Sequence, residues 1–82
     1  MEFTPNIWIK EGGFALSVIS SVTEAIDFLA SWPQDRRGPF YYLAVNSLQS
    51  AVAGSIETRE AREVFEVFCR EAGILAESRM ED

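Results

Sequence analysis

The sequence predicts an α+β domain in which a two-stranded N-terminal β-hairpin is followed by three α-helices, in the order ββααα. Three observations indicate this class. Apolar residues alternate with polar ones on either side of the glycine pair at 12–13. Apolar residues then recur at helical spacing in three later segments, and prolines and glycines separate these segments. Strands followed by helices in a short chain are typical of an α+β arrangement around one core.

The chain has enough residues for one domain only. It has 82 residues, of which 48% are apolar and 24% charged, and both fractions are near the averages of globular domains. We therefore expect residues 1–82 to form a single core, with frayed ends over 1–5 and 78–82. Apolar runs are too short for a membrane span, and residues 1–20 lack the basic start of a signal peptide. A cytoplasmic location is the expectation that follows.

The predicted hairpin covers residues 7–19. A Gly-Gly pair allows the positive φ angles of a two-residue turn, so Glu11 is expected to pair with Phe14. This register places on one face Ile7, Ile9, Leu16 and Val18. It places on the other face Trp8, Lys10, Ala15 and Ser17. We expect the first set to pack on the helices and Trp8 to point outward.

The first helix is predicted from Val22 to about Trp32. Ser21 and Glu24 have the spacing of a capping box, and Pro33 ends the segment. The inward residues expected for this helix are Val22, Ala25, Ile26 and Leu29.

The second helix is predicted from Pro39 or Phe40 to Ala53, and the third from Thr58 to Ala72. Gly54 and Gly73 follow them at the position where a left-handed residue usually ends a helix. The inward residues expected are Tyr41, Ala44, Val45, Leu48, Ala51 and Val52 in one helix, and Ala61, Val64, Phe65, Phe68 and Ala72 in the other. The apolar run at 74–76 is compatible with a short C-terminal strand.

Charge and residue types argue against several classes of function. The net charge is −6, with acidic residues concentrated toward the C-terminus, so we expect no binding to nucleic acid or to an anionic membrane. The chain has no histidine and a single cysteine, Cys69, which is too little for a zinc site. Glu66 and Glu71 near Cys69 predict an inert, half-buried thiol. We therefore expect no enzyme activity, no metal and no cofactor.

The first candidate site is an anion-binding site at Arg36, Arg37 and Gly38. These residues precede the second helix, where partial positive charge and free N–H groups make adjacent cations unfavourable without a partner. A bound anion would supply that partner. Internal ion pairs with Asp35, Asp27 or Glu24 would do so too, and we favour this second interpretation.

The second candidate site is an interaction surface made of Trp8, Phe40 and Tyr42. The hairpin register turns Trp8 outward, and the two other aromatic residues lie beside the inward stripe of the second helix. Such a surface would serve a homodimer or another protein partner. By contrast, we expect Trp32 to cover the core and Arg62 to join neighbouring elements.

Several residues together resemble a family of small bacterial proteins known as domain of unknown function 982. The residues that carry the resemblance are Trp32-Pro33, Arg37-Gly38, Ala44, Gly54, Ala61-Arg62, Phe65 and Ala72-Gly73-Ile74. The resemblance covers most of the chain from the first helix onward, and the hairpin fits the family loosely. It implies a stand-alone bacterial domain and assigns no activity, so no functional residue follows from it.

These observations favour an uncharacterised small domain that acts as a non-catalytic protein-interaction or self-associating module. Its unassigned aromatic residues and the open edge of a two-stranded sheet lead to this prediction. The alternative is a small regulator that binds an anion or a metabolite through Arg36, Arg37 and the start of the second helix.

Overall fold

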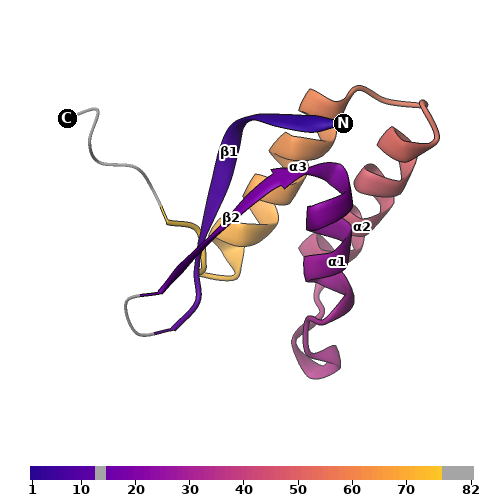
Figure 1. The fold of residues 1–82 in the computed structure, drawn as a ribbon. Helices are drawn as coiled ribbons and strands as arrows, with labels where there is room; N and C mark the ends of the chain where they lie inside the picture. Colours follow the sequence, from indigo (N-terminus) through magenta and orange to yellow (C-terminus); the bar gives the residue numbers. More distant parts are fainter. Residues whose placement is uncertain (13–14, 77–82) are drawn as a thin grey trace.

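The computed structural model describes residues 1–12 and 15–76, and within them the order ββααα is confirmed (Figure 1). The strands are β1 (Glu2–Lys10) and β2 (Leu16–Ser21). The helices are α1 (Val22–Ala30), α2 (Pro39–Val52) and α3 (Thr58–Glu71), with a single 3₁₀ turn over Gln34–Arg36 between α1 and α2. The protein is therefore an α+β domain.

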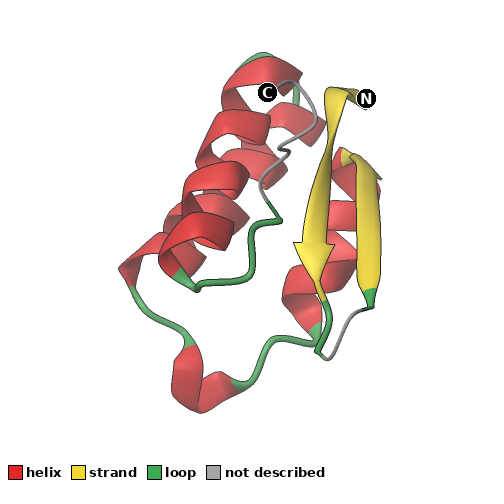
Figure 2. Ribbon diagram, turned by 90° about the vertical axis from the view of Figure 1, so that its left-hand side faces the viewer, coloured by secondary structure: helices red, strands yellow, loops and turns green. Residues whose placement is uncertain are grey.

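The hairpin covers one side of the helices (Figures 1 and 2). β1 packs against α3 and β2 against α1, while α2 lies between α1 and α3 on the side away from the sheet. Only one face of the sheet therefore contacts helices, and its other face is turned away from the core.

One apolar core joins all the elements. Phe65 of α3 lies at its centre, and the Phe65 ring centroid is about 6 Å from those of Phe3, Phe28 and Phe68. The buried apolar residues are Phe3, Ile7, Ile9, Ile19, Val22, Ala25, Leu29, Tyr41, Ala44, Leu48, Ala51, Ala61, Phe65, Phe68, Cys69 and Leu75. Each strand and each helix contributes to this set, as a single-domain fold requires.

The N-terminal residues are part of the sheet, so the expectation of a frayed segment over 1–5 is wrong. β1 begins at Glu2, and the Phe3 side chain is only 3% exposed. The backbone oxygen of Met1 also accepts a hydrogen bond of 3.0 Å from the N–H of Val22. Burial of the Phe3 ring against Phe65 offsets the conformational entropy that this short segment loses. The other segment expected to fray, 78–82, lies outside the described residues.

The hairpin register differs by one residue from the predicted one. Glu11 pairs with Ala15, so three residues rather than two connect the strands. The Cα partners are Ile7 with Ile19, Trp8 with Val18, Ile9 with Ser17 and Lys10 with Leu16. One extra residue in the connection moves every side chain of the second strand to the opposite face. Leu16 and Val18 therefore point outward, whereas Ile19 is buried.

The helices end close to their predicted positions, with two corrections. α1 ends at Ala30, because Trp32 already lies in the turn before Pro33. Val52 is 53% exposed and does not belong to the inward stripe of α2, which follows Tyr41, Ala44, Leu48 and Ala51. Val52 is the last residue of α2, where no neighbouring described helix covers its side chain.

Left-handed glycines end α2 and α3, as predicted. Gly54 has φ of +83° and Gly73 has φ of +76°. After Gly73, the Ile74 N–H donates to the Cys69 oxygen at 3.0 Å, which is the bond expected of a Schellman motif. This turn redirects the chain from α3 toward β1.

The segment after α3 lies along the edge of β1 that β2 does not occupy. Lys10 N–H donates to the Ile74 oxygen at 2.8 Å, and Ala76 N–H donates to the Trp8 oxygen at 2.9 Å. Leu75 forms an isolated antiparallel bridge with Ile9. Up to residue 76 this pairing is a bridge rather than a strand, and β1 has a neighbour on both of its edges.

Candidate functional site

The outward side of the hairpin carries a group of exposed apolar residues, Trp8, Leu16 and Val18, which we call the outer face. Their exposed fractions are 47%, 56% and 40%. Trp8 and Val18 are direct cross-strand partners, and Leu16 is two residues from Val18 on the same side. The three side chains therefore form one continuous apolar patch.

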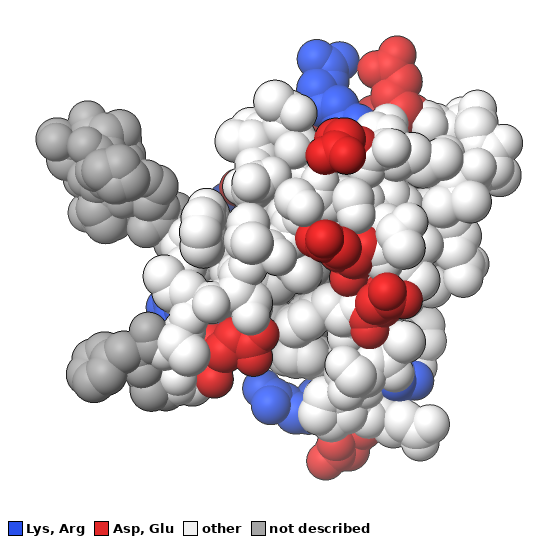
Figure 3. Space-filling view, viewed as in Figure 1, with Lys and Arg blue, Asp and Glu red and all other residues white. Residues whose placement is uncertain are grey.

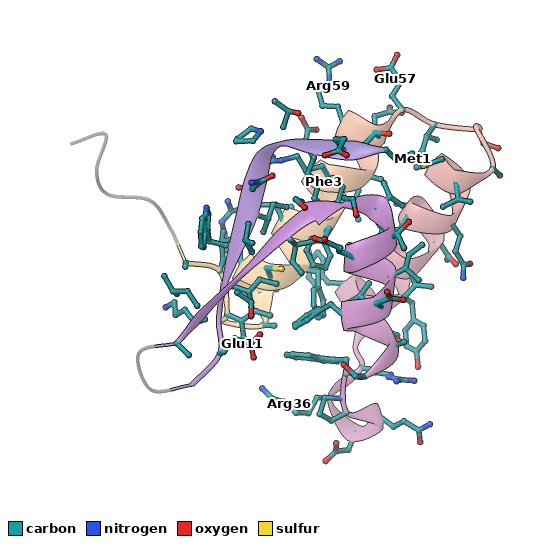
Figure 4. The ribbon with its side chains drawn as sticks, in the orientation of Figure 1. Met1, Phe3, Glu11, Arg36, Glu57 and Arg59 are labelled. Carbon is teal, nitrogen blue, oxygen red and sulfur yellow. The ribbon has the colours of Figure 1, made fainter. Side chains whose placement is uncertain are left out.

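The alternation of β1 explains why a large aromatic residue lies on this side. Ile7 and Ile9 are 2% and 1% exposed and face α3, so Trp8 between them must point the opposite way. The hairpin region on the left of Figure 3 is mainly uncharged, whereas acidic side chains gather over the α1 side of that view. Glu11, labelled in Figure 4, lies at the turn end of the hairpin.

The predicted interaction residues do not form one surface. Trp8 lies on the hairpin, whereas Phe40 and Tyr42 lie on α2, which packs on α1 and α3. Phe40 and Tyr42 are 40% and 54% exposed, but residues two positions apart in a helix point in nearly opposite directions. Trp8 has exposed apolar neighbours on its sheet face, whereas on α2 the exposed Phe40 lies three residues before the exposed Leu43, on a separate surface.

Sequence reasoning missed Leu16 and Val18 as members of the outer face. The missing information was the length of the connection between the strands. With two connecting residues both side chains point inward, and with three they join Trp8. Alternation alone gives no such signal, because it places Leu16 and Val18 on one face of the strand and Ile19 with Ser17 on the other, and the face with more apolar residues is the one that lies outward.

Arg37 is engaged inside the fold. Its Nε donates to the Trp32 oxygen at 3.0 Å and its Nη2 to the Ala30 oxygen at 3.4 Å. Its guanidinium carbon also lies 4.8 Å from the centroid of the Tyr41 ring. A cation at the carbonyl end of α1 is favourable because that end carries partial negative charge. The ion pairs expected with Asp35, Asp27 or Glu24 are not found among the described residues, and Arg37 instead contacts carbonyl oxygens and a ring.

Arg36 is exposed and lies against the face of Trp32, 5.0 Å from the ring centroid. The indole N–H of Trp32 donates to the Arg36 oxygen at 3.1 Å. Gly38 caps α2 through its backbone oxygen, which accepts from the N–H groups of Tyr41 and Tyr42 at 3.0 and 3.3 Å. Anion binding by Arg36 and Gly38 stays a prediction.

Arg36 and Gly38 share a shallow pocket with Phe40, Phe68 and Glu71. Its volume is about 210 Å³, below the range of roughly 300–1,000 Å³ that is usual for small-molecule sites. The Glu71 carboxylate in its wall adds negative charge, which opposes an anionic ligand. A second pocket of about 180 Å³ lies between α1 and α2 and is lined mainly by apolar residues.

Cys69 is fully buried rather than half-buried. Its exposed fraction is 0%, and burial, aided by the charge of Glu66, raises the pKa of the thiol to about 12. A thiol in this state is neutral near pH 7 and is not a nucleophile.

Two further side chains have the structural roles that the sequence predicts. Arg62 joins β1 to α3, because its Nε donates to the Pro5 oxygen at 2.7 Å and its Nη1 pairs with Glu66 at 3.3 Å. Trp32 covers the edge of the core, with its ring 5.2 Å from that of Phe68. Neither residue is available for a ligand without loss of these contacts.

The described residues contain no cluster of three or more His, Cys, Asp or Glu side chains that could hold a metal ion. None of the helices in this part of the chain combines the length and the apolarity needed to cross a bilayer.

A family model described as "Protein of unknown function (DUF982)" matches residues 7–76. The match starts within β1, at residue 7, and so covers the regularly paired part of the hairpin. The resemblance seen in the sequence was loose in this region. No curated protein and no solved structure matches the chain.

Proposed function

The chain belongs to the DUF982 family of proteins of unknown function, and we propose that it is a non-catalytic domain that binds another protein chain through its hairpin. The observation that carries this proposal is the outer face. Trp8, at 47% exposure, lies beside Val18 and Leu16 on the side of the sheet that none of the described helices covers.

The energetics of the outer face support an interaction role. Exposed aromatic and aliphatic groups gain roughly 25 cal/mol per Å² of apolar area when a partner covers them. Tryptophan is among the residues that contribute most to protein interfaces. A small domain that could bury Trp8 within its own core would gain stability, so leaving it at the surface is consistent with a role in binding.

The geometry of the polar groups supports the absence of catalysis. Cys69 is buried and has a pKa of about 12, and Arg37 and Arg62 are engaged with backbone oxygens. The pocket beside Arg36 and the pocket between α1 and α2 are both small, about 210 and 180 Å³. A reaction at either would lack both a nucleophile and the volume to exclude water.

Anion binding is the second candidate, and it has less support. Arg36, Gly38 and the start of α2 line one pocket, which favours it. The inward contacts of Arg37 and the presence of Glu71 count against it. If it is correct, millimolar phosphate shifts the amide resonances of Gly38 to Tyr41, and if those resonances stay unmoved, this candidate is removed.

A capture experiment with two matched variants tests the interaction function. Immobilised wild-type chain, Trp8→Ala and Tyr42→Ala are each incubated with native lysate of the source organism. We expect the wild type and Tyr42→Ala to retain the same proteins, and Trp8→Ala to lose them. Tyr42 is a suitable control because it is an aromatic residue of similar exposure, 54% against 47% for Trp8, but lies on α2. Equal retention by Trp8→Ala would contradict the role of the outer face.

A further inference from the structure

The outer edge of β2 has backbone groups that point into solvent. Glu11 N–H donates to the Ala15 oxygen, so odd-numbered residues of the second strand direct their polar groups toward β1. The backbone groups of Trp8 and Lys10 bond to the segment after α3, on the side of β1 away from β2. These two residues are the cross-strand partners of Val18 and Leu16. By alternation, Leu16 and Val18 direct their N–H and C=O groups outward.

This edge is open in the fold. Figure 2 shows α1 behind the two strands and the segment after α3 beside β1, with β2 at the opposite margin of the sheet. Within residues 1–12 and 15–76, no backbone partner is present for the outward groups of Leu16 and Val18. Unpaired strand edges of this kind are templates for another strand.

The far end of the edge is closed. The next outward-pointing N–H along β2 belongs to Ser20, and it donates to Glu24 Oε1 at 2.8 Å. The open edge is therefore centred on Ser17, with Leu16 on one side and Val18 on the other. A second antiparallel strand pairs with all of these groups when its own Leu16 lies opposite Val18 and its own Val18 lies opposite Leu16.

Apart from the end closed at Ser20, the strand lacks the residues that normally prevent such pairing. Its sequence, LSVISS, contains no charged residue and no proline. The chain as a whole carries a charge of −6, yet the contact places leucine opposite valine and serine opposite serine. The paired residues themselves thus bring no like charges together, and the nearest carboxylate, that of Glu11, accepts a hydrogen bond from the Ser17 hydroxyl of its own chain.

We propose that the partner of the hairpin is a second copy of this chain, joined along β2 about a two-fold axis at Ser17. This inference rests on the proposed function, because it names the occupant of the hairpin surface. The antiparallel ladder of β1 and β2 continues across the axis, giving a four-stranded sheet in the order β1-β2-β2-β1. The outer faces of both copies then form one larger apolar surface, and closed two-fold contacts are the commonest kind between identical chains.

Mixed isotope labelling tests the register directly. Ser17 does not hydrogen-bond across the axis, so the Hα atoms of the two Ser17 residues face each other closely. In a mixture of ¹³C-labelled and unlabelled chains, a filtered NOE spectrum is expected to show a cross-peak between Ser17 Hα atoms of different copies. Sedimentation equilibrium is expected to give a mass that rises from 9.2 kDa toward twice that value between about 10 µM and about 1 mM.

Two substitutions at Val18 separate edge pairing from side-chain packing. Val18→Pro removes the outward N–H, which the pairing with β1 does not use, and edge positions tolerate proline. Val18→Thr keeps that N–H and a β-branched side chain. We expect Val18→Pro to weaken self-association about tenfold or more and Val18→Thr to change it little. Circular dichroism checks that both variants remain folded.

The outcomes distinguish this inference from the proposed function. A chain that stays at 9.2 kDa near 1 mM, while Trp8-dependent capture persists, overturns the inference and leaves the proposed function intact. Self-association without the Ser17 cross-peak overturns the edge pairing. A third outcome is self-association with the Ser17 cross-peak, while Trp8→Ala captures the same proteins as the wild type. This outcome supports the edge pairing and contradicts only the proposed binding role of the outer face.

Discussion

At the scale of single residues, the side chains best suited to catalysis or ligand binding, Cys69 and Arg37, make contacts within the fold instead. Cys69 is enclosed by the core, and the guanidinium of Arg37 is held by two carbonyls and the Tyr41 ring. Burial disfavours the charged form of a thiol, which is why the pKa of Cys69 is raised to about 12. These residues contribute to stability rather than to reactivity.

The raised pKa of Cys69 predicts loss of stability in alkaline solution. In the unfolded chain the thiol has a pKa near 9.0, and in the native protein about 12. Above pH 9 the unfolded state therefore binds fewer protons than the native state, and stability falls as the pH rises toward 12. At pH 10 this contribution is on the order of 1 kcal/mol. Urea denaturation at pH 8 and pH 10 measures it.

Cys69→Ala is the control for this pH effect. It removes the thiol and leaves the rest of the sequence unchanged, so the difference between the two pH dependences isolates the contribution of Cys69. If the free energy of unfolding falls equally with pH in Cys69→Ala and in the wild type, the thiol has the same pKa in the folded and the unfolded state, which contradicts this prediction.

At the scale of elements, Arg37 fastens the end of α1 to the start of α2. It lies one residue before the cap of α2 and contacts the last turn of α1 and the turn that follows. Without this contact, backbone oxygens at the end of α1 would lose a charged donor, and Tyr41 would lose the cation over its ring.

Substitution of the two adjacent arginines tests this role. Arg37→Ala is expected to lower the free energy of unfolding by about 1–2 kcal/mol, through the lost hydrogen bonds and ring contact. Arg36→Ala, whose side chain is exposed on Trp32, is expected to cost less than about 1 kcal/mol. Arg37→Lys recovers only part of the loss, because an ammonium cannot replace a planar fork. Equal effects of the two alanine variants, measured by urea denaturation, would refute this assignment.

The helices could be predicted from the sequence because their signals are local. Ser21 accepts from Glu24 N–H at 3.2 Å as a cap should, although the Glu24 carboxylate binds Ser20 rather than Ser21. Gly54 and Gly73 have the expected left-handed conformation. Helical spacing, caps and terminating glycines all lie within a few residues of the structure they specify.

The hairpin register could not be predicted from the same kind of signal. It depends on one residue in the connection and on a distant choice, namely whether Leu16 or Ile19 packs against the helices. Phe3 entered the core for a similar reason, since its partner Phe65 is far away in the sequence. The candidate site inherited this error, so Trp8 was found from the sequence and its neighbours Leu16 and Val18 were not.

At the scale of the whole molecule, the fold separates one apolar core from the exposed outer face of the hairpin, and further exposed apolar residues lie on α2, among them Phe40, Leu43 and Val52. The inner face of the hairpin and the helices form one core around Phe65, and the outer face carries Trp8, Leu16 and Val18. A domain of 82 residues has a small margin of stability, so each buried side chain matters. Apolar groups kept out of that core are those that a partner can cover.

The central claim is that the outer face serves binding and not folding, and neighbouring residues of β1 test it most directly. Trp8 is 47% exposed and Ile9 is 1% exposed, on opposite sides of the same strand. We predict that Trp8→Ala lowers the free energy of unfolding, measured by urea denaturation at low protein concentration, by less than about 1 kcal/mol. Ile9→Ala is predicted to lower it by about 2–5 kcal/mol. A loss for Trp8→Ala as large as that for Ile9→Ala would place Trp8 in the core and contradict the claim.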